Sequence, residues 1–157
     1  MRLRSASETR SRLDGLVHFD TQQSAAQDGL DLTAASMFAF TAPGRLDFGG
    51  DEEQPAERRR LDPEKHDPED DYGWWDLEAG TYAVRFNEAV ELASGQVALV
   101  VPHERLLQAG AHHPVSGLRA PREASEAIEA VLSVGRAGLH IKENARLSTL
   151  LLFDGTG

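Results

Sequence analysis

One aspartate set between two leucines is the residue whose position most suggests chemistry. In the stretch QDGLDLTA, residues 27–34, an Asp-Gly turn pair precedes alternating apolar and polar residues, and Asp31 stands between Leu30 and Leu32. Aspartate is depleted in β-strands, so this position needs a reason. Two explanations stay open. Asp31 is either a solvent-facing residue at a strand end, or a carboxylate held at the rim of a β-barrel for catalysis.

Short strands are expected to position this aspartate. The stretches Leu30–Phe40 and Gln96–Pro102 predict core strands, the second buried on both faces. Further strands are expected on both sides of the turn Glu78–Gly80 and of the polar turn Glu143–Asn144. Many short strands between turn signals predict a mainly β fold, a β-barrel or jelly roll, with one or two short helices.

The remaining segments carry weaker patterns. Residues 5–16 predict a short amphipathic helix, and HERLLQAGAHH, residues 103–113, predicts a second helix that ends at Gly110. The stretch GLVHFDTQ, residues 15–22, predicts a strand, whereas residues 126–134 fit a helix or a strand. Residues 51–71 hold three prolines and dense charge, which predicts a solvated loop within a single domain spanning residues 1–157.

Composition narrows the function classes. The formal net charge is −10, which argues against a nucleic-acid partner because phosphate would be repelled. Cysteine is absent, which excludes disulfides, thiolate metal sites and a cysteine nucleophile. The chain has no run of 18 apolar residues and no apolar segment of a secretory signal, so we expect no membrane association and a cytoplasmic location.

The basic residues are mostly arginine. Lys65 and Lys142 are the only lysines beside many arginines and acids. An acid-rich, lysine-poor surface stays hydrated in concentrated salt, where the screening length falls to a few Å. This composition predicts a halophilic protein from a salt-accumulating cell. An ordinary acidic domain is the alternative.

Histidines and tryptophans offer further candidate sites. Adjacent His112 and His113 would point to opposite faces of a strand, and a surface pair is favoured over a metal site. His66, among the acids of the charged loop, is expected to be exposed, with a metal- or partner-binding role of that loop as the alternative. For Trp74 and Trp75, one ring in the core and one at an interface is favoured over stacking on a base. We therefore assign no metal ligand from the sequence.

In their order along the chain, three stretches resemble motifs of the dUTPase and dCTP deaminase superfamily. QDGLDLTA resembles its Ala-Gly-x-Asp-Leu element, and WDLEAGTYAVRFNEAVEL, residues 75–92, resembles its Leu-x-Pro-Gly-Glu strand pair. ENARLSTLLLF, residues 143–153, resembles its late Gly-x-Arg-Ile-x-Gln-Leu strand. The resemblance spans roughly residues 15–153 and implies a distorted jelly-roll β-barrel that assembles as a homotrimer, with deoxynucleoside triphosphate sites between subunits.

The resemblance also implies a role for Asp31. In the dUTPase branch, the aspartate at this position helps to hold hydrated Mg²⁺ on the triphosphate, which makes Asp31 the candidate catalytic residue and Mg²⁺ the implied cofactor. The alternative is that Asp31 only caps the turn after Gly29.

The phosphate-binding motif departs from the superfamily pattern. Aligning VPHERLLQAGA on Gly110 places His103 at the arginine of Gly-Arg-Ser-Ser, and Glu104 and Arg105 at its serines. Gln108 takes the place of the second arginine of the deaminases. Arg105 and Gln108 remain as candidate nucleotide contacts, whereas Glu104 at a helix start would repel phosphate.

Elements of the pyrimidine pocket and of catalysis are missing too. Residues 112–131, which should form that pocket, lack the Asp-x-x-Tyr and Asp-Pro-Gly-Trp elements. Val131 stands where a deaminase carries its water-activating glutamate, and the chain ends shortly after residue 153 without the glycine-rich lid of dUTPases.

Two functions follow from these matches and departures. The first is a divergent enzyme of pyrimidine deoxynucleotide metabolism, which acts on or binds dUTP or dCTP through Asp31, Arg105 and Gln108. The second is a non-catalytic trimeric relative that keeps the fold but has lost the phosphate-binding and water-activating motifs. Whether the protein is an enzyme stays open at this point.

Overall fold

A computed structural model describes residues 1–23 and 28–155. Its helices are α1 (Ala6–Arg10), α2 (Phe19–Gln22) and α3 (Glu104–Gln108). The strands of the first half are β1 (Arg2–Leu3), β2 (Leu13–Asp14), β3 (Leu30–Phe40), β4 (Arg58–Leu61), β5 (Trp74–Leu77), β6 (Gly80–Phe86) and β7 (Ala89–Val90). Those of the second half are β8 (Gln96–Pro102), β9 (Ala111–His112), β10 (Ser116–Arg119), β11 (Glu129–Val134), β12 (Leu139–Lys142) and β13 (Arg146–Asp154). The protein is mainly β, as the sequence predicted.

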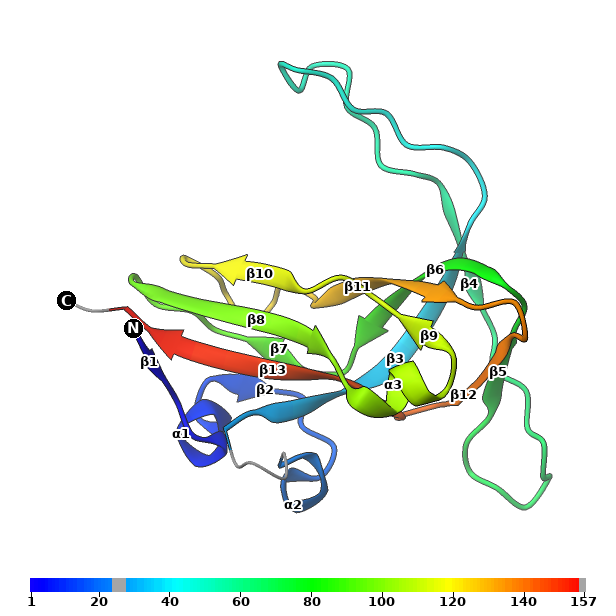
Figure 1. Ribbon diagram of the computed structural model, residues 1–157, viewed down its shortest axis with the longest axis horizontal. Coiled ribbons are helices and arrows are strands. Elements are labelled where there is room, and N and C mark those ends of the chain that lie inside the picture. Colours follow the sequence, from blue (N-terminus) through cyan, green and yellow to red (C-terminus); the bar gives the residue numbers. More distant parts are fainter. Residues whose placement is uncertain (24–27, 156–157) are drawn as a thin grey trace.

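A curled antiparallel sheet forms the body of the molecule (Figure 1). In the described chain its strand order is β10-β8-β13-β3-β6-β11-β9, with β1 paired to β13 and β4 paired to β3. Two small sheets, β12-β5 and β2-β7, complete the described strands. This mainly β, antiparallel arrangement agrees with the predicted jelly roll.

Strand β3 joins the two halves of the curled sheet. Its first residues pair with β13, with Asp31 opposite Thr149, and its later residues pair with β6 and β4. Register shifts between Ala34 and Ser36 on β3, and between Arg146 and Ser148 on β13, mark irregularities that let one strand change partners. The predicted bounds of β3 and β8 are confirmed.

The core is built around the three neighbouring strands β8, β13 and β3 of this sheet. Leu30 and Leu32 of β3, Val100 of β8, and Leu150 and Leu152 of β13 are fully buried there. The prediction that Gln96–Pro102 is buried on both faces is wrong for the single chain, because the residues alternate between buried and half-buried. Only one face of this strand is covered by the body of its own chain.

Several local predictions need correction. Residues 15–22 contain helix α2 instead of a strand, and His18 caps that helix by accepting from Thr21 N–H. The N-terminal helix is shorter than predicted: it ends at Arg10, and Leu13 belongs to β2. Residues 126–134 fitted a helix or a strand, and in the structure they contain strand β11, which begins at Glu129. Helix α3 is confirmed, with Ala109 at its C-cap and Gly110 at φ +89°.

The predicted loop at residues 51–71 is also partly wrong, because it contains β4. This strand pairs with the far end of β3, where Arg58 stacks on the Phe38 ring and forms an ion pair with Glu129. Residues 41–57 project from the body as a long arm (Figure 1), and Arg45 pairs with Gln54 across it. None of the described helices exceeds five residues, too short for an apolar span of a bilayer.

Candidate functional site

Asp31 is enclosed, with 1% of its surface exposed. Its Oδ1 accepts a hydrogen bond from Thr149 Oγ (2.8 Å), and its Oδ2 accepts one from Arg146 Nη1 (3.1 Å). The explanation of a solvent-facing strand residue is therefore wrong. Because the carboxylate binds side chains of β13 across the sheet, it also does more than cap a local turn.

His103 connects Asp31 to helix α3. This histidine is the N-cap, and its Nδ1 accepts from the Arg105 backbone N–H at 3.1 Å. An acceptor Nδ1 assigns the proton of a neutral ring to Nε2, which lies 3.5 Å from Asp31 Oδ2. The residue at the superfamily's arginine position thus holds the start of α3 against the buried carboxylate.

A cavity of about 200 Å³ with mixed polar and apolar walls adjoins this cluster. Arg105 of α3 and Arg146 of β13 line it, together with Val17, His18, Thr21, Gln22, Thr33, Asn144 and Ala145. No carboxylate is among its lining residues in the described chain. Arg105 is exposed, and within residues 1–23 and 28–155 its guanidinium has no hydrogen-bond or ion-pair partner. The cavity is therefore suited to an anion.

Gln108 lies apart from the cavity. It is exposed on α3 and makes a long hydrogen bond of 3.5 Å to Glu104 Oε1. The fold therefore brings together two of the three candidate site residues. Arg105 lines the cavity, and Asp31 lies behind the cavity wall, where it binds Arg146. Gln108 is outside this group in the single chain.

A buried polar network supports the floor of the cavity. Glu88 is 1% exposed and accepts from Gln22 Nε2 (2.7 Å), from Thr33 N–H (2.8 Å) and from Thr33 Oγ (2.7 Å). Asn87 Nδ2 donates to Thr33 Oγ and to Asn144 Oδ1, each at 2.8 Å. Burial raises the pKa of Glu88, and its hydrogen bonds from Thr33 and Gln22 oppose that rise in part.

Comparison with known proteins decides the family. No family model matches the chain. A probable deoxyuridine 5′-triphosphate nucleotidohydrolase of Methanosarcina mazei is 30% identical over 135 residues, which cover 85% of this chain and 74% of that protein. The chain belongs to the dUTPase and dCTP deaminase superfamily.

Two further comparisons agree with this family. The protein of the same name from Methanosarcina acetivorans is 28% identical over 159 residues, covering 98% of this chain and 88% of that protein. The crystal structure of 2′-deoxycytidine 5′-triphosphate deaminase from Agrobacterium tumefaciens superposes with a TM-score of 0.66 at 16% identity. It is matched over 98% of this chain but 48% of its own length, and at this identity it supports the fold alone.

Family membership raises the question of Mg²⁺, which prefers several oxygen ligands. The side chains around Asp31 are an arginine, a histidine and a threonine, and both carboxylate oxygens already accept hydrogen bonds. A guanidinium in this position occupies the place of a cation. The described residues of one chain therefore do not form a Mg²⁺ site at Asp31.

Sequence reasoning missed Arg146 and Glu88. Arg146 is the charged residue that opens the uncharged stretch LSTLLLF, residues 147–153, and an isolated charge at the start of a core strand is a usable signal. Glu88 carries no such signal, because it stands among other polar and acidic residues. Its burial depends on donors from α2 and β3 that only the fold brings together.

The histidine and tryptophan predictions had mixed outcomes. The favoured surface pair is wrong for His113, which is buried, with Nε2 2.7 Å from Ser148 Oγ and Nδ1 2.8 Å from the Pro114 carbonyl oxygen. Burial lowers the pKa of this ring, whereas His112 is exposed. Trp75 is in the core, which confirms that prediction for one ring of the pair. Trp74 is half-buried, and its expected place at an interface stays a prediction.

Proposed function

We propose that this protein binds the triphosphate of a pyrimidine deoxynucleotide at the cavity between α2, α3 and the start of β13, and hydrolyses dUTP. The observation that carries the proposal is the Arg105 guanidinium, which has no partner among residues 1–23 and 28–155, in a cavity that also contains Arg146. Guanidinium groups bind phosphate oxygens through charge-assisted hydrogen bonds. The curated relatives bear the name of a dUTP nucleotidohydrolase, which makes dUTP the first substrate to test.

In this reaction water attacks phosphorus, the α–β phosphoanhydride bond breaks, and dUMP and diphosphate leave. Arg105 would bind the phosphate oxygens, and Asp31 would hold Arg146 and His103 in place behind it. Gln108 remains a candidate nucleotide contact, which an assembled trimer would have to bring into reach. Deamination of dCTP is less favoured, because the curated relatives are named for dUTP hydrolysis and Val131 stands where a deaminase carries its water-activating glutamate.

Nucleotide affinity tests the phosphate contact directly. We expect Arg105→Ala to weaken binding of dUTP, measured by calorimetry with a non-hydrolysable analogue, by roughly 10-fold or more, since a charge-assisted hydrogen bond contributes about 1.5–3 kcal/mol. Arg119→Ala is the matched control, an exposed arginine on β10 that does not line the cavity. Equal affinities for the two variants would refute the proposed phosphate contact.

Turnover is tested separately, with dUTP and dCTP supplied as Mg²⁺ complexes in molar KCl. The enzyme proposal expects diphosphate release from dUTP that is lost in Asp31→Ala and reduced in Arg105→Ala. Gln108→Ala tests the third candidate residue. Mg²⁺ enters here as the counter-ion of the nucleotide and as the cofactor that the family resemblance implies.

The second candidate is a non-catalytic relative that retains the barrel. Two observations favour it: Glu104 stands in the first turn of α3, where it disfavours phosphate, and the Asp31 carboxylate is fully engaged. Absence of turnover with either nucleotide, in a protein that light scattering shows to be assembled, would support this function.

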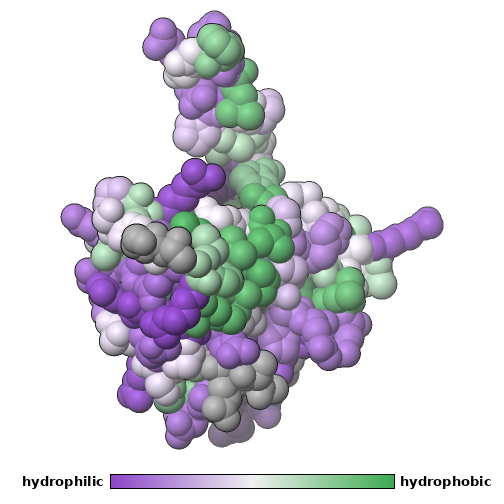
Figure 2. All heavy atoms as spheres, turned by 60° about the vertical axis from the view of Figure 1, so that its left-hand side comes forward, coloured by the Kyte–Doolittle hydropathy of each residue, from purple (hydrophilic) through white to green (hydrophobic). Residues whose placement is uncertain are grey.

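We further propose a homotrimer. Val97, Leu99 and Val101 of β8 are half-buried on the face that the chain leaves uncovered. Figure 2 shows hydrophobic side chains gathered in one area below the projecting arm, with hydrophilic side chains around them. Burial of such surface between copies is a favourable contribution to assembly. Light scattering should give three times the chain mass of 17.1 kDa.

The halophilic and cytoplasmic character also remains a proposal that rests on composition. With 26 acidic against 16 basic residues, mutual repulsion should destabilise the fold at low salt. We expect the urea midpoint to rise from dilute buffer to molar KCl. A higher midpoint in dilute buffer would contradict the halophilic proposal and favour an ordinary acidic domain.

A further inference from the structure

Three side chains from separate parts of the chain meet on the surface outside the lining of the proposed nucleotide cavity, although His140 shares a neighbouring pocket with Arg105 and Arg146. Asp76 of β5 and His140 of β12 are directly opposite each other in the antiparallel pair, so both point to the same face. His66 reaches this face from the segment between β4 and β5. His66 Nε2 lies 3.0 Å from both carboxylate oxygens of Asp76, and His140 Nδ1 lies 2.5 Å from Asp76 Oδ1.

The position of His66 is fixed by more than its contact with Asp76. Its ring stacks on the Trp74 indole, with centroids 5.1 Å apart and planes inclined by 4°. Two backbone hydrogen bonds between Glu64 and Trp74, of 2.9 and 2.8 Å, hold the segment just before it against β5. The imidazole is therefore presented to Asp76 by an ordered segment.

We propose that His66, Asp76 and His140 bind a divalent transition metal, with Zn²⁺ as the preferred ion. The facing donor atoms of the three side chains all lie within 4.8 Å of one another. Two imidazole nitrogens and one carboxylate oxygen are a ligand set that Zn²⁺ uses, at distances of about 2.0–2.2 Å. Small side-chain rotations bring the donors to that distance, and all three side chains are exposed enough to make them.

The protonation chemistry of the cluster is compatible with a metal. Each imidazole nitrogen that faces Asp76 carries a proton when it donates to the carboxylate. The metal takes that place once the proton has moved to the other ring nitrogen or to solvent. Both oxygens of the Asp76 carboxylate face the imidazoles, so an oxygen is in place as the third ligand.

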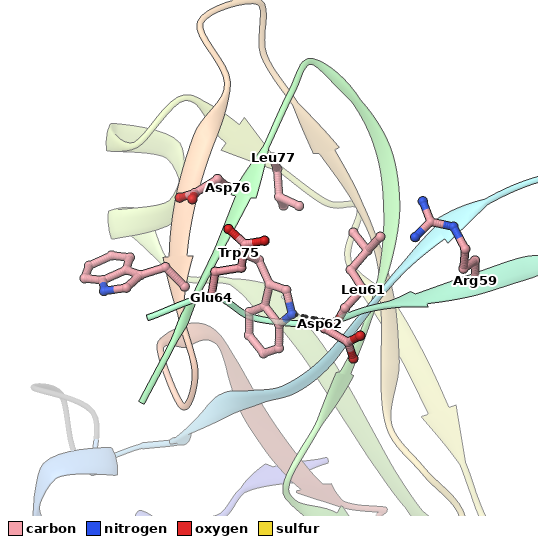
Figure 3. A pocket seen from close by; sticks show the side chains of 8 residues that line it. Arg59, Leu61, Asp62, Glu64, Trp75, Asp76 and Leu77 are labelled. Atoms are coloured by element: carbon pink, nitrogen blue, oxygen red, sulfur yellow. Dashed lines mark hydrogen bonds between the residues drawn. The ribbon is translucent and has the colours of Figure 1, made fainter. Parts of the chain in front are cut away.

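The surroundings add negative charge. Asp76 lines a pocket together with Asp62, Glu64 and Arg59, so three carboxylates and one guanidinium line it. In the same pocket the Trp75 Nε1–H donates to the Leu61 carbonyl oxygen at 3.0 Å (Figure 3). The nearby cation Lys142 forms an ion pair with Asp70. A surface with several carboxylates near the cluster attracts a cation before it is coordinated.

The site would tether the segment before β5 to the β5-β12 sheet. Three protein ligands leave a further coordination position to water, and each ligand comes from a different stretch of the chain. Bound Zn²⁺ would therefore cross-link residues 66, 76 and 140 without involving Asp31 or Arg105. None of the three ligands lines the proposed nucleotide cavity.

Zn²⁺ binding to chelator-treated protein tests the proposal. Equilibrium dialysis should give one Zn²⁺ per chain, and His140→Ala and His66→Ala should each weaken binding about 10-fold or more, because even partners of ligands have effects of that size. His112→Ala, an exposed histidine on β9, is the matched control and should bind like the unmodified protein. Far-UV circular dichroism confirms that each variant is folded.

A second readout separates this site from adventitious binding. Stoichiometric Zn²⁺ should shift the NMR signals of the His66 and His140 rings and leave those of His112 and His113 in place. The proposal is overturned if the signals of His66 and His140 do not move, or if His140→Ala and His66→Ala bind Zn²⁺ as tightly as the control. Because His66 lies outside the strands, its variant keeps the test valid even if His140→Ala fails to fold.

Discussion

Two aspartates of this protein contact histidines, and they differ mainly in burial. The Asp31 side chain is 1% exposed and contacts His103, Arg146 and Thr149, whereas the Asp76 side chain is 42% exposed and contacts His66 and His140. Water cannot replace the partners of Asp31, but it competes for those of Asp76.

This difference in burial determines which of the two aspartates can exchange its hydrogen-bond partners. A carboxylate in the core must keep every hydrogen bond, because an unpaired charge there is costly. Asp31 therefore acts as a fixed support for α3 and β13, and the ligand-binding role passes to the exposed Arg105 beside it. Because Asp76 is exposed, water can replace a hydrogen bond that it loses when its neighbours move. Asp76 can therefore change from hydrogen-bond acceptor to metal ligand.

The largest expected effect on stability comes from changing Asp31, the buried aspartate. Asp31→Ala should lower the free energy of unfolding by about 3 kcal/mol, because it removes the acceptor of Thr149 and the charged partner of Arg146, which within the described chain keeps only its hydrogen bond to the Thr21 carbonyl oxygen. Urea unfolding followed by circular dichroism measures it. A loss well below about 1 kcal/mol would show that water readily reaches this cluster.

Glu88→Gln should have the next largest effect. In either orientation the substituted amide points its NH₂ group at a donor, the Thr33 N–H on one side or Gln22 Nε2 and Thr33 Oγ on the other, at a cost of about 1–3 kcal/mol. Because burial raises the pKa of Glu88, the native chain binds this proton more tightly than the unfolded chain. The stability that Glu88 gains from this tighter proton binding is greatest below the unfolded pKa of about 4.3, and it is lost as the pH rises through the native pKa.

The pH dependence checks that sign. The stability of the unmodified protein minus that of Glu88→Gln, from urea unfolding between pH 4 and pH 8, should decrease as the pH rises. An increase over that range would mean that the hydrogen bonds from Thr33 and Gln22 outweigh burial.

Asp154 should respond to pH in the opposite direction. Hydrogen bonds from Arg4 first, and then from Gln96, lower the pKa of Asp154 to about 2. A lowered native pKa contributes stability above the unfolded pKa of about 3.9, which is lost as the pH falls toward 2. In Asp154→Asn, the free energy of unfolding, measured by urea unfolding, should therefore fall less between pH 4 and pH 2 than in the unmodified protein. An equal fall in both proteins would show that the hydrogen bonds of Asp154 do not cause the acid sensitivity.

The smallest expected effect is that of Asp76→Asn in the absence of metal. Its ion pairs with His66 and His140 are exposed, so the urea midpoint should stay within experimental error of the unmodified protein. With saturating Zn²⁺ the two proteins should separate, because the ion stabilises only the chain that binds it. A large midpoint shift without Zn²⁺ would remove the contrast with Asp31.

Apolar patterns predicted the elements that lie in the core. Strands β3 and β8 have the predicted bounds, since the residues that face the core are encoded locally. Strand β4 could not be found this way. Its sequence, RRRL, has no apolar alternation, and the strand forms because the end of β3 offers backbone partners and Phe38 and Glu129 receive Arg58.

Helix α2 was mistaken for a strand for a related reason. Leu16, Val17 and Phe19 suggest a strand, but His18 caps the helix and the Gln22 side chain reaches Glu88 and the backbone of Asp31. These partners are far away in sequence. A local pattern does not contain them, so the tertiary contacts override it.

By itself, the sequence determined the β class, the core strands and the order of motifs that identifies the superfamily. Alternation and turn residues act within a few positions, and the chain carries them whether folded or not. Only the tertiary structure decided that Asp31 is buried against Arg146, that His113 is inside, and that His66 meets Asp76 and His140. Burial and convergence depend on which distant segments cover a given face, and that information exists only once the sheet has closed.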